Sequence, residues 1–497
     1  MVAPWEKSIG EAARLRWAKE ILKGSSLATE FPDVDCGIPR MVEVRAGGAA
    51  GAAEELAPIR SPLRVTLGGG ERILPNRDED RGALPARLTE AIEALRGEGD
   101  VDPAEQALVR EIAGSDRGGR FYPNLSGVLR SENVYPISYM KPEEGIAYVR
   151  LGLGVGNRAS MDALRFSPAH PDLMPDFSTP EDILRNSQRK FAAVDLSGGV
   201  EAAAPGGSAR FDLEAAYRDG ALAPVGGIYS RENRMVYPGV HREGIRLVTF
   251  APMLRGGAFP LAKLMRALLD LFGAAAPEPL AIEFAVDLRD PRKGERHRFI
   301  VEGIGPLDED AGGGTTETIE GDAAAADVLC SSTATLGHGL FTGLRDILCV
   351  CPDRFDVSRS HEIACEVGER NDRLAREERP YVLIGSGRWG TTDRWLGIPV
   401  SWEQVSRARV QVEAGLEDFN VESSRGTHFF RELTFHGIGA MHISLRKPGD
   451  RIDWDWLQSA STEWEGAFVR HITLAEPLRV RIDGRAGRGI IRRPSAG

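Results

Sequence analysis

The pattern of apolar and polar residues along the chain predicts helices in several places. In residues 7–23 apolar residues such as Trp17 and Ile21 recur near the spacing of helical turns, which is typical of an amphipathic helix. Residues 259–272 are strongly apolar and predict a buried helix. Residues 178–182 (Ser-Thr-Pro-Glu-Asp) predict the start of a further helix, because they combine a capping hydroxyl with proline and acids in the first turn.

The amino-terminal hundred residues mix weaker signals. Residues 39–44 predict a short strand, whereas residues 46–57 are almost all Ala, Gly and Glu and indicate a loop or a weak helix. Residues 83–113 carry two helical patterns separated by residues 97–100 (Gly-Glu-Gly-Asp). The second pattern opens at residues 102–105 (Asp-Pro-Ala-Glu), where an N-cap acid precedes proline, so two helices are predicted here.

Between residues 119 and 307 predicted strands alternate with helices, which favours a mixed α/β fold. We expect four segments of this region to share one sheet: residues 128–131, 146–151, 280–288 and 298–302. Residues 308–326 are rich in Gly, Ala, Thr and acids and predict a linker. Residues 327–497 then predict a second, smaller α/β domain, with a helix at 358–378 and a strand at 381–384.

Composition narrows the class of protein. The chain has 497 residues, of which 42% are hydrophobic and 27% charged, as in ordinary globular proteins. Its net charge of −11 argues against nucleic acid or an anionic membrane as a partner. No apolar run approaches the length of a membrane span. Five cysteines without a Cys-x-x-Cys pair suggest neither a zinc site nor a redox dithiol, and we expect a cytoplasmic protein.

One acidic residue interrupts an apolar strand. Glu283 stands between Ile282 and Phe284 in the segment 280–288. A carboxylate inside a central strand is costly unless it is paired or binds a metal ion. The alternative is that Glu283 lies on the solvent side of a half-exposed strand.

The segment 119–133 (Gly-Arg-Phe-Tyr-Pro-Asn-Leu-Ser-Gly-Val-Leu-Arg-Ser-Glu-Asn) is followed by a second predicted strand and the glycines of Leu151-Gly152-Leu153-Gly154. Glycines directly after a strand let backbone N–H groups approach an anionic oxygen. The order of these motifs resembles the nucleotide-binding domain of the pyruvate phosphate dikinase and phosphoenolpyruvate synthase family, an ATP-grasp fold. The resemblance extends over most of residues 119–485.

The resemblance implies a set of site residues and two cofactors, ATP and Mg²⁺. In the family the Ser-Gly-Val-x-x-Ser strand and the glycine loop line the ATP phosphates, which here implies roles for Ser126, Arg130, Gly152 and Gly154. Glu283 matches the carboxylate that holds Mg²⁺, and a carboxylate oxygen suits that ion.

Several positions depart from the family pattern. Gly303 and Gly305 replace a glutamine and an arginine, and Val155 stands where the family has a lysine. Arg158 and Arg165 are candidates to replace that lysine's charge, although loop arginines are often simply solvated. The segments that surround the family's catalytic arginine are shortened. Arg60 is therefore either its remnant or a surface-loop arginine.

These departures lead to two hypotheses. In the first, the chain is a degenerate relative that keeps the fold as a scaffold or partner-binding subunit; a nucleotide, a protein partner and further copies of the chain are the candidate partners. In the second, it is an active Mg-ATP phosphotransferase acting on an unidentified acceptor. The glycines at 303 and 305, Val155 and the shortened amino-terminal segments favour the first. The sequence has no Thr-Ser-His-Ala-like carrier motif and no recognisable pyruvate-binding barrel, so we expect that this chain alone does not make phosphoenolpyruvate. The predicted organisation is an eroded amino-terminal ATP-grasp-like subdomain (1–118), the nucleotide-binding domain (119–307), the linker and the carboxy-terminal domain.

Overall fold

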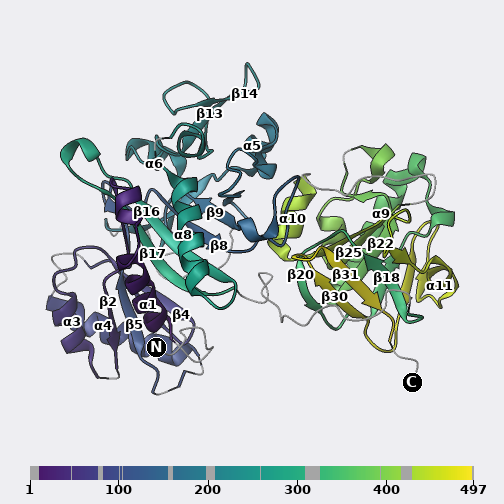
Figure 1. Ribbon diagram of the computed structural model, residues 1–497, viewed down its shortest axis with the longest axis horizontal. Helices are drawn as coiled ribbons and strands as arrows, with labels where there is room; N and C mark the ends of the chain where they lie inside the picture. Colours follow the sequence, from purple (N-terminus) through teal and green to yellow (C-terminus); the bar gives the residue numbers. More distant parts are fainter. Residues whose placement is uncertain are drawn as a thin grey trace. The chain divides into compact units, whose positions relative to one another are not determined.

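The computed structural model describes residues 10–45, 47–76, 82–99, 101–102, 104–154, 161–197, 208–257, 259–307, 325–391, 393–415 and 428–494. These residues form two compact units of mixed α/β structure, drawn in Figure 1. The first unit comprises Met1–Ser131 and Gly145–Pro306, and the second comprises Glu132–Glu144 and Leu307–Gly497. The first unit ends at Pro306, and the excursion of Glu132–Glu144 into the second unit was not predicted. Nearly all of the predicted linker lies outside the described residues.

The centre of the first unit is a six-stranded sheet with the order β1-β17-β16-β8-β9-β10. Its neighbours are antiparallel except for β1 and β17, which run parallel. The strands are β1 (Val34–Gly37), β17 (His297–Pro306), β16 (Leu280–Asp287), β8 (Leu125–Arg130), β9 (Ile146–Arg150) and β10 (Leu164–Phe166). The prediction that four segments of the chain share this sheet is confirmed.

Helices cover one face of this sheet. The main one is α8 (Leu261–Ala275), which Figure 1 shows running across the strands. Helix α1 (Glu11–Lys23) packs beside it, with the ring centroids of Trp17 and Phe272 5.6 Å apart, and α2 (Leu27–Glu30) follows α1. Leu264 and Leu268 of α8 are buried in the same core cluster as Leu129 and Ile282 of the sheet. The rings of Phe284 and Phe299 stack in that core with centroids 5.0 Å apart. This packing explains why residues 259–272 are so strongly apolar.

A second, antiparallel sheet with the order β2-β5-β3-β4 forms the amino-terminal part of the unit. Its elements are β2 (Met41–Val44), β5 (Ala107–Glu111), β3 (Leu63–Leu67), β4 (Gly70–Leu74), α3 (Ala49–Leu56) and α4 (Leu84–Glu98). Residues 11–37 pack with the six-stranded sheet instead, so the predicted subdomain 1–118 does not fold as one piece.

The predicted helix from residue 102 is wrong, because this segment forms β5. The local signal is real, since the Asp102 side chain accepts a hydrogen bond of 2.8 Å from the Ala104 N–H. However, β5 pairs with β2 on one side and with β3 on the other. Hydrogen bonds along both edges of a central strand outweigh a single capping interaction.

Two smaller sheets and three helices complete the first unit. The sheets have the orders β12-β11-β7-β6 and β14-β13-β15. Their elements are β12 (Ala209–Asp212), β11 (Lys190–Asp195), β7 (Arg120–Tyr122), β6 (Ser115–Asp116), β14 (Met235–Pro238), β13 (Gly226–Ser230), β15 (Ile245–Val248), α5 (Pro180–Asn186), α6 (Leu213–Arg218) and α7 (Ala251–Leu254). The predicted cap of α5 is confirmed, because the Thr179 hydroxyl accepts a hydrogen bond of 3.0 Å from the Asp182 N–H.

The second unit is built around a seven-stranded sheet with the order β19-β26-β25-β22-β21-β29-β28, whose four central strands β26, β25, β22 and β21 are parallel. A five-stranded sheet has the order β20-β30-β31-β18-β27, and β23 and β24 form a separate two-stranded parallel sheet. The strands are β18 (Val328–Ser332), β19 (Thr335–Leu336), β20 (His338–Phe341), β21 (Asp346–Cys349), β22 (Tyr381–Ser386), β23 (Arg388–Trp389), β24 (Gly397–Ile398), β25 (Ala408–Ala414), β26 (Gly439–Ile443), β27 (Arg451–Ile452), β28 (Trp464–Glu465), β29 (Arg470–Thr473), β30 (Arg479–Asp483) and β31 (Arg488–Arg492); the helices are α9 (Ser360–Arg376), α10 (His428–His436) and α11 (Trp454–Ser459).

Candidate functional site

The face of the six-stranded sheet opposite α8 is polar, and its residues follow from the strand register. Val128 pairs with Tyr148 in β9 and with Glu283 in β16, and Tyr148 pairs in turn with Arg165 in β10. Residues that are paired directly across antiparallel strands point to the same side of a sheet. We call this side the polar face; besides the apolar residues Ile146, Ala285 and Ile300 it carries Arg165, Tyr148, Arg150, Ser126, Val128, Arg130, Ala281, Glu283, Gly303 and Gly305.

Three arginines on adjacent strands give the polar face a positive charge. Arg150 and Arg165 are buried, whereas Arg130 is half-buried and lies 5.1 Å from the centre of the Tyr148 ring. Arg150 forms an ion pair of 3.3 Å with Asp162, and burial lowers the pKa of its guanidinium. The protein interior has a low dielectric constant and therefore screens the charge of these buried cations only weakly. Their electric field extends to the accessible part of this face.

Glu283 is the half-buried acidic residue of this face. Burial is the main cause that raises the pKa of its carboxyl group to about 7, and the neighbouring Glu11 and Glu302 act in the same direction. Arg110 and Arg64 oppose this shift without cancelling it. A carboxyl group in such surroundings exchanges its proton readily for a metal cation, because either one neutralises the buried charge.

A charged cluster from β3 and β5 lies beside Glu283. Arg64 and Arg110 are paired across these strands, and both are buried. Arg110 donates a hydrogen bond of 2.5 Å to the Glu302 carbonyl and also contacts the Glu11 carboxylate. Arg64 lies 3.9 Å from the Glu302 carboxylate. Glu302 is the residue left without a partner where the register between β16 and β17 shifts, so a β-bulge brings it into this cluster.

Structural contacts account for three of the residues that the sequence predicts as phosphate ligands. The Ser126 hydroxyl donates a hydrogen bond of 2.7 Å to the Gly152 carbonyl. Gly152 has a φ of +85°, and a Cβ atom there would lie 2.5 Å from the Ala192 carbonyl oxygen. A Cβ atom on Gly154 would lie 3.2 Å from the Ser126 hydroxyl oxygen. These residues therefore hold the turn after β9 against its neighbours. Val155, Arg158 and Ser160 lie outside the described residues.

Arg60 lies in an exposed turn, where its guanidinium donates to the Ala57 carbonyl at 3.4 Å. The arginine that acts on Glu283 from this part of the chain is Arg64, which sequence reasoning missed. Its signal was present, because Arg64 interrupts the apolar strand Leu63–Leu67 much as Glu283 interrupts β16. A charged residue in such a strand indicates a buried partner.

The second unit contains a different charged cluster. Ligand atoms of Asp346, Glu463 and His471 lie within 4.8 Å of one another, a spacing that would suit a metal ion. However, Arg370 donates to His471 at 2.8 Å, and Arg379 donates to Glu463 at 2.8 Å and also pairs with Asp346. Two arginines already neutralise these groups, so the cluster is best explained as a structural ion-pair network.

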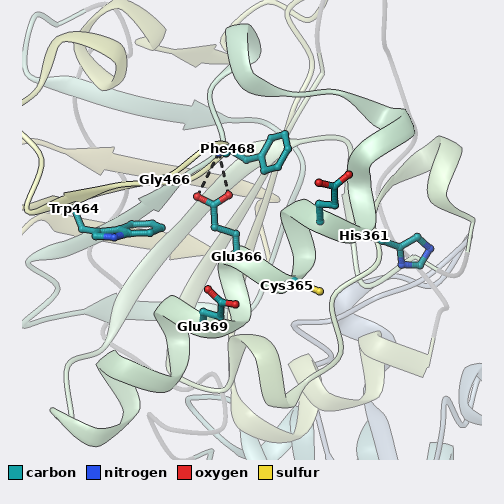
Figure 2. Close-up of a pocket in the computed structure, with 9 residues that line it drawn as sticks. His361, Cys365, Glu366, Glu369, Trp464, Gly466 and Phe468 are labelled. Atoms are coloured by element: carbon teal, nitrogen blue, oxygen red, sulfur yellow. Dashed lines mark hydrogen bonds between the residues drawn. The ribbon is translucent and has the colours of Figure 1, made fainter.

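Figure 2 shows a hollow of about 500 Å³ along α9 in the second unit. The Glu366 carboxylate accepts a hydrogen bond of 3.0 Å from the Phe468 N–H, and the His361 side chain points away from this pair. Arg370 lies 5.3 Å from the centre of the Trp464 ring, so a cation of the protein already contacts that ring. The hollow therefore lacks the converging free groups expected of a ligand site.

Within the described residues no helix is long and apolar enough to cross a membrane. Comparison with models of known protein families finds no match, and comparison with curated proteins finds none either.

Proposed function

We propose that the first unit binds a nucleoside polyphosphate together with Mg²⁺ over the polar face of its six-stranded sheet, and that it acts as a nucleotide-binding subunit or scaffold. The observation that carries this proposal is the placement of Glu283 beside a row of arginines on one sheet face. The resemblance of the motifs to the dikinase family supports the same ligand.

In this proposal the carboxylate and the arginines have separate tasks. Glu283 would provide an oxygen ligand for Mg²⁺, which prefers hard oxygen donors. Arg130 would contact phosphate oxygens, whereas the buried Arg150 and Arg165 would contribute a positive field without direct contact. The bound cation would bridge the phosphate charge and the Glu283 carboxylate. The residues of the chain thus bind and orient the ligand.

A second candidate function is phosphotransfer to an acceptor. It is favoured by Arg64, which lies between Gly154 and Glu283 and could supply a fixed positive charge near the transferring group. Against it stand Gly303 and Gly305, which lack the hydrogen-bonding side chains of active relatives. A hydrogen bond to a charged group contributes about 1.5–3 kcal/mol, so two losses would weaken the site strongly.

Isothermal titration of the full chain with ATP and Mg²⁺ tests the binding proposal. The titration is best done near pH 8, because the Glu283 carboxyl, with a pKa of about 7, is then mostly ionised. We expect saturable binding that Glu283→Gln weakens and that Glu295→Gln leaves unchanged, since Glu295 is exposed in the turn between β16 and β17. Absence of heat up to millimolar ATP would contradict nucleotide binding.

A coupled assay for phosphoenolpyruvate separates the two functions. The family reaction needs a histidine that carries the phosphoryl group, and the sequence contains no motif for one. We therefore expect no phosphoenolpyruvate when the protein is incubated with ATP, Mg²⁺ and pyruvate. Turnover that disappears in Glu283→Ala would show that the chain is an active enzyme.

A further inference from the structure

Two glycines of β17 present no side chain at the polar face, and charged side chains from elsewhere occupy the space beside them. Gly303 pairs with Glu283, and Gly305 pairs with Ala281. A Cβ atom on Gly303 would lie 3.2 Å from the carboxyl carbon of Glu283. The two glycines are two residues apart in a strand, so their open sides face the same way.

The guanidinium of Arg14 fills the space beside Gly305. Its Nη1 lies 2.9 Å from the position that a Cβ atom on Gly305 would occupy. Arg14 belongs to α1, whose residues Leu15, Ala18 and Leu22 are buried in the core and fix the helix in place. The Arg14 side chain is half-buried, and its Nε is buried without a hydrogen-bond partner.

A second arginine, Arg130, lies on the opposite side of Ala281 from Gly305. Ala281 pairs with Gly305 in β17 and with Arg130 in β8, so it lies between Arg130 and the glycine that Arg14 contacts. The Nε of Arg130 is also buried without a hydrogen-bond partner, while its guanidinium lies 5.1 Å from the centre of the Tyr148 ring. Adjacent strands lie about 4.8 Å apart, so β8 and β17 are separated by roughly 10 Å across Ala281.

We propose that Arg14 and Arg130 form the two walls of a phosphate subsite whose floor is Ala281. Two guanidinium groups with buried, unpartnered nitrogen atoms are costly unless an anion pairs with them. Glu283 lies two residues after Ala281 in β16 and on the same face. A cation bound by Glu283 would therefore lie next to this phosphate. The inference rests on the proposed function and names its phosphate-binding residues. It makes α1 part of the nucleotide site.

Titration of three variants with ATP and with adenosine, both in the presence of Mg²⁺, tests this subsite. We expect Arg14→Gln and Arg130→Gln each to weaken ATP binding about 10-fold or more, because each loses a charge-assisted hydrogen bond. Adenosine lacks phosphate, so its affinity should stay unchanged in all variants. The matched control is Arg16→Gln, because Arg16 is an exposed arginine of the same helix that pairs with Glu43.

The double variant Arg14→Gln/Arg130→Gln distinguishes a shared phosphate from two independent effects. If both arginines contact one group, the loss in the double variant should differ clearly from the product of the single losses. Unchanged ATP affinity in both single variants, with binding still sensitive to Glu283→Gln, would overturn the subsite and leave the proposed function standing. No ATP binding by the unmodified protein would overturn both. Circular dichroism and the unfolding temperature of each variant confirm that it is folded.

Discussion

The guanidinium of Arg64 donates a long hydrogen bond, 3.5 Å, to the carbonyl oxygen of Gly154, which lies 90 positions later in the chain. This contact ties the amino-terminal sheet to the turn that follows β9. It also places a buried cation beside the glycines that the sequence singles out. The carboxylates of Glu302 and Glu71 outweigh the opposing effect of burial and hold the pKa of Arg64 above its ordinary value.

Arg64→Leu should therefore destabilise the first unit, because it leaves buried carboxyl groups without their cation. We expect a loss of about 3–5 kcal/mol in the free energy of unfolding, as is usual when one member of a buried ion pair is removed. Arg60→Gln is the matched control and should change stability by less than about 0.5 kcal/mol, because Arg60 is exposed. Calorimetry of the full chain measures both, and equal effects of the two substitutions would refute the central role of Arg64.

Glu283 should make the stability of the protein depend on pH in an unusual direction. Its pKa rises from 4.5 to about 7 on folding, so between these values the folded state keeps a proton that the unfolded state has lost. The free energy of unfolding therefore falls as pH rises from about 4.5 to about 7, by up to about 3 kcal/mol. Glu283→Gln removes this contribution, so the variant should gain stability relative to the unmodified protein at pH 8 but not at pH 4. Denaturation with urea at both pH values, with a chelator present, checks the prediction. A variant that is less stable at pH 8 would contradict it.

Added Mg²⁺ should reverse the effect of pH at this site. A metal ion binds the ionised carboxylate, so its binding releases the proton that Glu283 holds below pH 7. We expect Mg-ATP to raise the unfolding temperature more at pH 8 than at pH 6. The same difference should disappear in Glu283→Gln, whereas Glu295→Gln should keep it. An equal gain at both pH values would argue against Glu283 as the metal ligand.

Gly152→Ala should destabilise the fold whether or not a nucleotide binds. The residue has a φ of +85°, and its Cβ would lie 2.5 Å from the backbone oxygen of Ala192. Strain of this kind costs on the order of 1–3 kcal/mol, and the close contact with backbone adds to it. Gly51→Ala is a suitable control, because Gly51 lies in α3 with open space around it. A loss of nucleotide affinity with unchanged unfolding temperature would instead assign Gly152 to the ligand.

Asp346 should stabilise the second unit at neutral pH. Burial opposes its ionisation, but hydrogen bonds from His471, Arg379 and Thr473 outweigh burial and lower the pKa of Asp346 to about 2. This contribution is complete above the unfolded pKa of 3.8 and is lost as pH falls through about 2. Asp346→Asn should cost roughly 2 kcal/mol at pH 7, and the cost should shrink in acid. Asp353→Asn, at an exposed carboxylate, should cost almost nothing.

Much of the framework follows from the sequence alone. The apolar spacing of residues 259–272 and the cap at Thr179 led to the helices α8 and α5, because helical periodicity and capping are local properties. The strand segments near 128, 148, 283 and 300 were also correctly placed in one sheet. The sequence further identified Glu283 as a charged residue in an apolar strand.

The tertiary structure decided which charges surround Glu283 and which segment forms β5. Glu11, Arg64 and Arg110 come from three separate parts of the chain, and no local pattern connects them to Glu283. Residues 102–105 carry a helix-start signal, but residues 107–111, which follow them, pair with β2 and β3 and form a strand. Helix periods and caps act over a few neighbouring residues, so the sequence determines them directly. Buried charge partners and sheet edges depend on chain segments that only folding brings together.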